Sequence, residues 1–341
     1  MKPIKPIIVL VSILFVMIIM IPTMLVIPFS DKEKETGKLA EEQQSNPEPP
    51  QIASGPTVEV AVHRASSNNI ENVPLEEYVI RVLASEMPGE FELEALKAQA
   101  LAARTYIVKQ MLSDQKLGVP EGAVVSDTTR HQVYYNREEL KKILKDEYDW
   151  KIEKITKAVA ETQGQILTYN GSPIDALFFS TSNGYTENSQ DYYQTEYPYL
   201  KSVPSPWDVN TEKFHDQIEM TITEFEQKLG IKVGNSKEIG KVTARTQSNR
   251  VATVEVGGKT FTGREIREAL KLRSTDFTWE RKGSHIVIQT KGYGHGVGMS
   301  QFGADGMAKE GKTYKDIVTY YYQGVQVSSA DDFINKLTVK K

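Results

Sequence analysis

Residues 74–112 read PLEEYVIRVLASEMPGEFELEALKAQALAARTYIVKQML, and this stretch decides the fold of the chain. Pro74 is typical of the first turn of a helix, and apolar side chains then recur on one helical face. Pro88-Gly89 ends this helix, and a second helix is predicted over about residues 91–112. Its centre, residues 98–103, holds mostly small side chains, which let neighbouring elements approach closely. We therefore predict that the second helix is buried.

Glu86 stands at the end of the first predicted helix. A carboxylate there opposes the helix dipole and costs about 0.3–1 kcal/mol, so the residue has no structural reason for its position. An apolar setting raises the pKa of a carboxyl group, which is what general acid catalysis requires. The sequence therefore makes Glu86 the candidate catalytic acid, although most glutamates near helix ends are ordinary surface residues.

Two cations follow on the second helix. Lys97 and Arg104 are seven residues apart, so they lie on the same helical face. Buried cations need partners. Either they form structural salt bridges to Glu90 or Glu94, or they hold Glu86 or a group of the substrate, and the sequence leaves both alternatives open.

The N-terminus predicts a membrane anchor. Residues 7–27 carry no charge, and at helical rise they span a hydrocarbon core of roughly 30 Å. Lys2 and Lys5 precede them, so residues 1–6 are predicted to be cytoplasmic and the rest of the chain extracytoplasmic. A cleaved signal peptide is the alternative, but its apolar region is shorter. We predict a single-pass protein of the cell membrane.

Composition narrows the function classes. Residues 28–56 are charged and rich in Pro and Gln, which predicts a disordered tether. The chain has a formal net charge of −4, which argues against nucleic acid as the main partner. It has no cysteine, which excludes disulfides, thiol nucleophiles and thiolate metal ligands.

The remaining residues predict an α+β fold. A helix-rich catalytic core with some strands is expected from residues 57–207 and 291–341, the latter including a C-terminal helix. Residues 208–290 read as a small inserted α+β module, because the segments 242–246 and 251–256 alternate as a hairpin and further helix and strand patterns follow. The predicted transmembrane helix precedes both the core and the module.

Two loops offer further candidate site residues. The glycine-rich stretch 292–303 contains His295 and Gln301, and its spacing fits neither a dinucleotide fingerprint nor a phosphate loop. The second loop is polar and contains Ser180, Ser182 and Asn183. Its hydroxyl and amide groups could bind sugar hydroxyl or acetamido groups, or the loop could be an ordinary polar turn. His131 is accompanied by neither a cysteine nor a nearby second histidine, so metal binding there is not expected.

Five blocks of sequence together resemble the stage II sporulation protein D family. The resemblance extends in order over roughly residues 57–327 and is carried by SEMP at 85–88, EALKAQA at 94–100, ARTY at 103–106, FSTSNG at 179–184 and GHGVGMSQ at 294–301. Each block is weak alone, and the set is specific.

The resemblance implies a peptidoglycan lytic transglycosylase. Such an enzyme cleaves the bond from N-acetylmuramic acid to N-acetylglucosamine in glycan strands without stem peptides and leaves 1,6-anhydro ends. Glu86 matches the catalytic acid/base of the family. The residues that match its site blocks, or a further cleft segment at 197–203, are expected to bind substrate: Lys97, Arg104, Ser180, Ser182, Asn183, Tyr199, Lys201, His295 and Gln301.

The resemblance also implies partners and bears on cofactors. The family acts in engulfment of the forespore with sporulation proteins M and P, the latter an amidase that supplies stripped glycan. The domain is then expected to face the wall between the mother-cell and forespore membranes. Some members bind zinc through His and Cys ligands near the position of His131. Because this chain has no cysteine, we expect no metal and no other cofactor.

A single carboxylate suits this chemistry. Most glycosidases use two carboxylates. A transglycosylase needs one, which protonates the glycosidic oxygen and then accepts the proton of the sugar's own 6-hydroxyl. The competing class is a non-catalytic wall-binding module that activates a partner amidase, since amidase-enhancer proteins share the domain.

Overall fold

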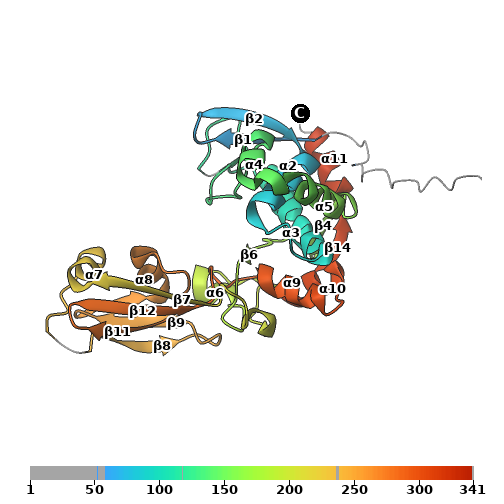
Figure 1. The fold of residues 1–341 in the computed structure, drawn as a ribbon. Helices are drawn as coiled ribbons and strands as arrows, with labels where there is room; N and C mark the ends of the chain where they lie inside the picture. Colours follow the sequence, from blue (N-terminus) through green and yellow to red (C-terminus); the bar gives the residue numbers. More distant parts are fainter. Residues whose placement is uncertain (1–51, 53–57, 117, 236–237, 340–341) are drawn as a thin grey trace, which may run out of the picture. The chain divides into compact units, whose positions relative to one another are not determined.

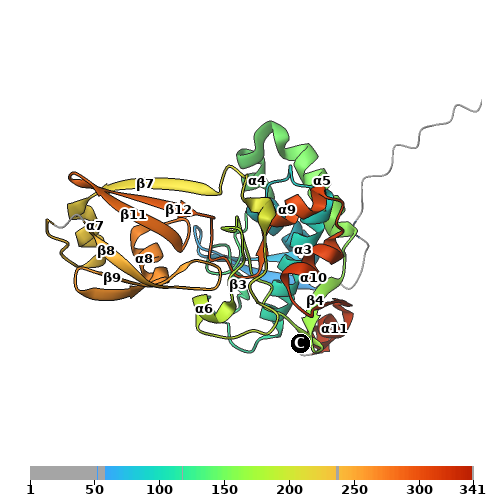
Figure 2. The same cartoon turned by 90° about the horizontal axis from the view of Figure 1, so that it is seen from below.

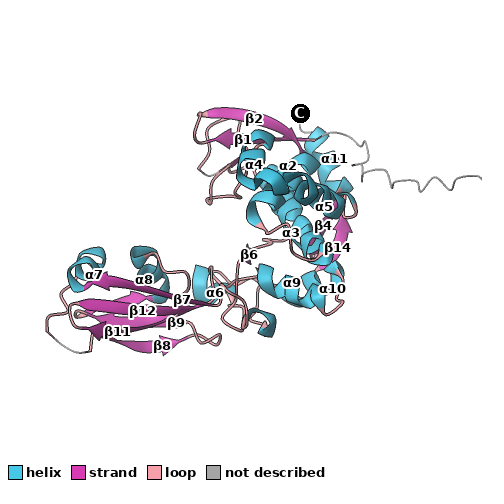
Figure 3. Ribbon diagram, in the orientation of Figure 1, coloured by secondary structure: helices cyan, strands magenta, loops and turns pink. Residues whose placement is uncertain are grey.

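The computed structural model describes residues 52, 58–116, 118–235 and 238–339, which belong to one compact unit, 49–341. Within this part of the chain, no helix is both long enough and apolar enough to cross a membrane. The predicted anchor at 7–27 and nearly all of the predicted tether 28–56 lie outside the described residues. The mixture of helices and strands confirms the predicted α+β class (Figure 3).

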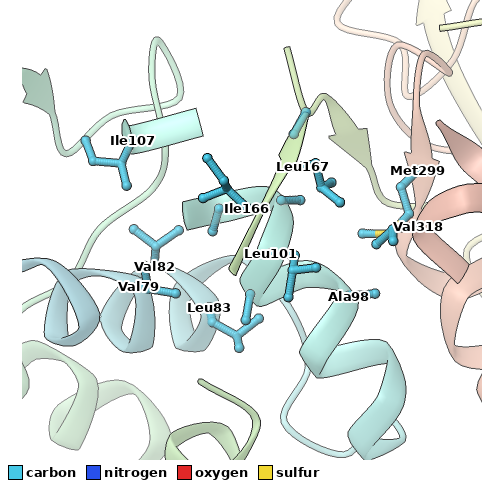
Figure 4. Packing of buried hydrophobic residues seen from close by; sticks show 14 of the residues in the cluster. Val79, Val82, Leu83, Ala98, Leu101, Ile107, Ile166, Leu167, Met299 and Val318 are labelled. Carbon is cyan, nitrogen blue, oxygen red and sulfur yellow. The ribbon is translucent and has the colours of Figure 1, made fainter. Parts of the chain in front are cut away.

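The central helix of the core is α3 (Leu93–Leu112), and its small-residue stretch, 98–103, is fully buried as predicted. Helices on several sides and strand β4 contact it, and Figure 2 shows the surrounding helices. Side chains of α2, α3, β4 and α10 form one apolar cluster (Figure 4). The helices of the core are α2 (Leu75–Glu86), α4 (Arg137–Leu144), η2 (Lys145–Glu147), α5 (Tyr148–Ala160), α6 (Ser189–Tyr193), η3 (Pro206–Asp208), α9 (Gln301–Lys309), α10 (Tyr314–Tyr321) and α11 (Asp331–Val339).

Short ladders connect distant segments of the core. The hairpin of β1 (Glu59–Arg64) and β2 (Asn69–Pro74) is joined in parallel by β3 (Val125–Ser126). A second sheet places β4 (Gln165–Tyr169) between β5 (Ser172–Pro173) and β14 (Gln326–Ser329). The parallel pair β6 (Phe178–Phe179) and β13 (Met299–Ser300) joins the two chain segments that flank the inserted module. This pair brings the polar loop after β6 beside the glycine-rich stretch.

The inserted module has its own hydrophobic core, in which Phe225, Val254 and Ile266 are fully buried. Helices α7 and α8 cover one face of its strands (Figure 1). The predicted hairpin of 242–246 and 251–256 is confirmed by the antiparallel register of β8 and β9. The pattern of residues 277–281 and 285–290 likewise predicts a pair around Lys282-Gly283, and β11 and β12 pair there. Its elements are β7 (His215–Thr221), α7 (Ile222–Leu229), β8 (Gly240–Arg245), β9 (Val251–Val256), β10 (Lys259–Thr262), α8 (Gly263–Leu270), β11 (Asp276–Lys282) and β12 (His285–Lys291).

The structure corrects the sequence prediction at two places. The pattern of residues 165–168 and 174–180 predicts a hairpin around Asn170-Gly171. The turn is present, but only the short strand β5 pairs with β4 after it, and β6 pairs with β13 instead. Helix α9 begins within the stretch that was predicted only as glycine-rich. Its Gly303 is required because a Cβ there would lie 2.5 Å from Ser205 Oγ, so a packing demand conceals the helical pattern.

Candidate active site

Glu86 is the last residue of α2, and Met87 leaves the helix with an extended backbone. The backbone N–H of Val133 donates a hydrogen bond of 2.7 Å to Glu86 Oε1. Among the described residues, no lysine or arginine forms an ion pair with this carboxylate. Burial raises the pKa of Glu86, and the bond from Val133 opposes that rise only in part. The side chain therefore has the environment of a carboxyl group that stays protonated above its usual range.

Residues 132–135, which follow β3, pack beside Glu86. The N–H of Tyr135 donates to Ser85 Oγ at 3.2 Å, one residue before Glu86 in α2. Gln132 is buried, and its Oε1 accepts from the hydroxyl of Tyr78 at 3.1 Å. The Nε2 of Gln132 has no hydrogen-bond partner within the described part of the chain. Val133 acts through its backbone, which no sequence pattern reports, so the sequence did not predict its role.

Gln301 is the predicted site residue that the structure brings directly to Glu86. It is the first residue of α9, and its Nε2 donates to the backbone oxygen of Glu86 at 3.0 Å. Ser300, the N-cap of α9, uses its side chain to accept from Gly303 N. The glycine-rich stretch therefore ends in a helix that is fastened to the C-terminal end of α2.

Lys97 and Arg104 are bound by other carboxylates. Lys97 Nζ lies 2.6 Å from Glu94 and 2.5 Å from Glu161. Arg104 is fully buried, and its Nε and Nη2 donate to Glu76 at 2.7–3.1 Å. Its Nη1 and Nη2 also donate to backbone oxygens of the core. These contacts correspond to the structural alternative, with Glu76 rather than Glu90 or Glu94 as the partner of Arg104; a role in substrate binding stays a prediction.

The polar loop after β6 is used mainly for internal contacts. Ser182 is fully buried and donates to Asp208 Oδ2 at 2.7 Å. Ser205 donates to the same oxygen, and Ser300 donates to Oδ1. Burial raises the pKa of Asp208, and the three serine hydroxyls oppose that rise. This cluster ties together three distant segments of the core.

Two neighbours of Ser182 also have protein partners. Ser180 Oγ contacts Thr181 Oγ1 at 3.2 Å. Asn183 Nδ2 donates to Asp276 Oδ2 at 2.9 Å and to the backbone oxygen of Ser248. The amide of Asn183 thereby links the core to the inserted module.

Tyr199 and Lys201 lie on the segment between α6 and η3. The hydroxyl of Tyr199 donates to Asp175 Oδ2 at 3.2 Å, and burial raises the pKa of Tyr199. Lys201 Nζ lies 2.5 Å from Glu196, a pair largely exposed to solvent. No contact between either residue and Glu86 is found in the described residues, so their binding roles stay predictions.

His295 packs among the rings of Phe179, Tyr192 and Tyr193, with centroid distances of 5.7–5.9 Å. Desolvation lowers its pKa to about 3, with further repulsion from nearby arginines, so the imidazole is neutral at physiological pH. Its Nδ1 accepts from Val297 N–H at 3.0 Å, which fits an acceptor role. The ring therefore stabilises the glycine-rich stretch.

His131 has a structural contact of its own. Its Nδ1 lies 3.2 Å from Ser126 N and 2.9 Å from Ser126 Oγ. In the part of the chain that the structure describes, no group of three or more His, Cys, Asp or Glu side chains is arranged to hold a metal ion. Among the described residues, Glu86 and Gln301 are the pair of predicted site residues that a direct hydrogen bond joins.

Comparisons with known proteins agree with the sequence resemblance. A family model described as Stage II sporulation protein matches residues 63–169. Stage II sporulation protein D of Bacillus subtilis is 51% identical over 335 residues, which cover 97% of this chain and 98% of that protein. Its counterpart in Bacillus amyloliquefaciens is 50% identical over 344 residues, covering 99% and 100%. The Bacillus subtilis protein named Amidase enhancer is 31% identical over 304 residues, 73% of this chain and 40% of that protein.

Proposed function

The chain belongs to the stage II sporulation protein D family, and on that premise we propose that it is a peptidoglycan lytic transglycosylase with Glu86 as its acid/base. One observation carries the proposal. Glu86 is a carboxyl group whose pKa is raised by burial and which has a backbone donor but no cationic partner among the described residues. Such a group can give a proton near neutral pH and take one back.

The proposed reaction uses this single group twice. Protonated Glu86 donates to the glycosidic oxygen while the bond from C1 of N-acetylmuramic acid to that oxygen breaks. The resulting carboxylate accepts the proton of the 6-hydroxyl, whose oxygen forms the new bond to C1. The products are a shortened strand with a free 4-hydroxyl and a 1,6-anhydro end, and Glu86 is protonated again.

The surroundings of Glu86 support both steps. The Val133 N–H stabilises the carboxylate that exists between the two proton transfers. The bond from Gln301 to the backbone of Glu86 holds the end of α2, so the carboxyl group starts from a fixed backbone position. Gln301 is therefore proposed as a positioning residue of the site.

The location and partners are part of the same proposal. We propose that residues 7–27 anchor the chain in the cell membrane, with the folded unit on the extracytoplasmic side during forespore engulfment. Sporulation proteins M and P are the proposed partners, and glycan strands stripped of stem peptides the substrate. The family supports a role in sporulation.

A second candidate function is a non-catalytic module that activates an amidase. It is favoured by the similarity to the protein named Amidase enhancer. In that case Glu86 would be dispensable, and the chain would increase the rate of a partner amidase without cleaving glycan itself.

The substitution Glu86→Gln separates the two functions. It keeps the shape of the side chain and removes the titrating proton, and loss of a general acid/base costs about 10²–10⁴-fold in rate. We expect 1,6-anhydro products from stripped glycan with the wild-type chain and almost none with the variant, while unfolding curves stay similar. Near-normal product formation by a folded Glu86→Gln chain would refute the assignment.

A further inference from the structure

A cavity of about 220 Å³ lies between residues 187–194 of the core and residues 246–264 of the inserted module. It is separate from Glu86, which does not line it. Most of its lining is polar, and the charged side chains in it are Glu187, Asp191, Arg250 and Arg264. The cavity therefore has the composition of a site for a polar ligand.

Arg250 is the unusual member of the lining. It is only 2% exposed, and its Nη1 donates to Tyr185 O at 3.1 Å and to Ser248 Oγ at 2.8 Å. Its Nε has no hydrogen-bond partner, and the guanidinium forms no ion pair, within the described residues. A buried cation in this state lacks the acceptor that its burial requires.

Gly296 shows how the plane of the Arg250 guanidinium is covered. A Cβ built on Gly296 would lie 2.6 Å from both Cζ and Nη2 of Arg250 and 2.8 Å from Nε. These nearly equal distances place the glycine over the plane of the guanidinium, so it does not occupy an edge. Nε is the group of Arg250 that lacks an acceptor among the described residues. In any arginine the N–H groups of Nε and Nη2 are parallel, and this geometry matches the two oxygens of a carboxylate.

The rest of the lining narrows the ligand class. Arg264 supplies a second guanidinium, with Cζ at 5.1 Å from the ring centroid of Tyr192, and its Nε also pairs with Glu268 at 2.8 Å. Glu187 already accepts hydrogen bonds from Thr246 and Ser248, and Asp191 accepts one from Asn188. Two cations and two carboxylates leave the lining nearly neutral. A nearly neutral lining suits a ligand that is uncharged apart from one carboxylate, such as an acidic sugar, better than it suits a small inorganic anion.

The glycine-rich stretch connects this cavity to Glu86. Gly296 covers Arg250, and Gln301 bonds to the backbone of Glu86. The two residues are five positions apart in the sequence, so their Cα atoms lie at most about 18 Å apart. One polymeric glycan can therefore reach both places.

We infer that the cavity binds the lactyl carboxylate of a muramyl residue through Arg250, with Arg264 as a second cation. The identity of the ligand rests on the proposed function. Removal of a stem peptide frees this carboxylate, whereas a peptide-bearing residue has an uncharged amide there. The inserted module thereby contributes a side chain that recognises glycan stripped of its peptides.

Binding is measured by calorimetry on the full-length chain with N-acetylmuramic acid, its methyl amide and N-acetylglucosamine. A hydrogen bond to a charged group is worth about 1.5–3 kcal/mol, so the acid should bind about 10- to 100-fold more tightly than the other two. Arg250→Gln and Arg264→Ala should each remove most of this preference. Arg281→Ala, on β11 of the same module and outside the cavity, is the matched control and should keep it.

The outcomes separate this inference from the proposed function. Glu86→Gln should bind the acid with unchanged affinity, because Glu86 does not line the cavity. A chain that prefers the acid but does not cleave glycan would refute the transglycosylase and keep the site. Equal binding of acid and amide, or no binding, would overturn the inference, as would an undiminished preference in Arg264→Ala, the variant that decides if Arg250→Gln does not fold.

Discussion

Two buried arginines have opposite surroundings. Arg104 in α3 is 0% exposed, and Glu76 binds both its Nε and its Nη2 while backbone oxygens take further N–H groups. Arg250 in the module is 2% exposed, has two acceptors on Nη1, and has none on Nε among the described residues. The difference teaches that burial of a charge does not by itself identify a site. A satisfied guanidinium stabilises the fold, and one with a free edge has binding capacity.

The largest expected effect is on Arg104. Arg104→Met should destabilise the protein by about 3–5 kcal/mol, because it strands the carboxylate of Glu76, whose side chain is only 12% exposed. Urea unfolding followed by circular dichroism measures the change. A loss below about 1 kcal/mol would show that Arg104 does not stabilise the fold in the way its contacts indicate.

A double-mutant cycle sharpens this result. The pair Arg104→Met and Glu76→Gln should show a coupling of about 0.5–3 kcal/mol, since the second substitution removes the charge that the first one strands. The matched pair Lys228→Met and Glu224→Gln, on the exposed face of α7, should couple by less than about 0.5 kcal/mol. Additive effects at Arg104 and Glu76 would mean that the two side chains act independently.

Arg250 should respond differently. Arg250→Met loses two hydrogen bonds, each worth about 1 kcal/mol, and the attraction of the buried Glu187, but it also relieves the cost of burying a charge whose Nε has no acceptor among the described residues. The two effects oppose each other, so the free energy of unfolding should change by no more than about 1 kcal/mol in either direction. The same urea experiment, run beside Arg104→Met, checks it, and equal losses in the two variants would remove the distinction between the arginines.

Much of the fold could be predicted from local patterns. The buried helix α3 follows from the small residues at 98–103, and the hairpin of β8 and β9 follows from strict alternation. Helix α9 could not be predicted, because Gly303 is set by the close approach of Ser205 from another part of the chain. The β6–β13 pair is equally non-local.

The candidate site likewise has some residues that local sequence identifies and others that only distant contacts reveal. Glu86 could be singled out because a carboxylate at a helix end has no local benefit, and Gln301 because it belongs to a recognisable block. The partner of Arg104 could not be chosen, since Glu76 lies a helix away, and Glu90 and Glu94 were nearer in sequence. Arg250 gave no signal at all, because its burial and its unpaired Nε arise only when the fold brings Tyr185 and Gly296 to it from distant segments.

The smallest expected effect is on the pH dependence of stability, and it extends the comparison from the two arginines to the carboxyl group of Glu86. Burial raises the pKa of Glu86 in the folded state above its ordinary 4.5. At a pH between the unfolded-state pKa and the raised folded-state pKa, the folded state therefore binds more protons than the unfolded state. By linkage, the stability of the wild type relative to Glu86→Gln should fall as pH rises through that window. Glu90 is the matched control, because Lys151 lowers its pKa and its contribution is instead lost as pH falls. Urea unfolding between about pH 4 and pH 7 should therefore give opposite slopes for Glu86→Gln and Glu90→Gln. Slopes of the same sign would mean that Glu86 is ionised in the folded protein as readily as a surface carboxylate, and the proposed acid would lose its physical basis.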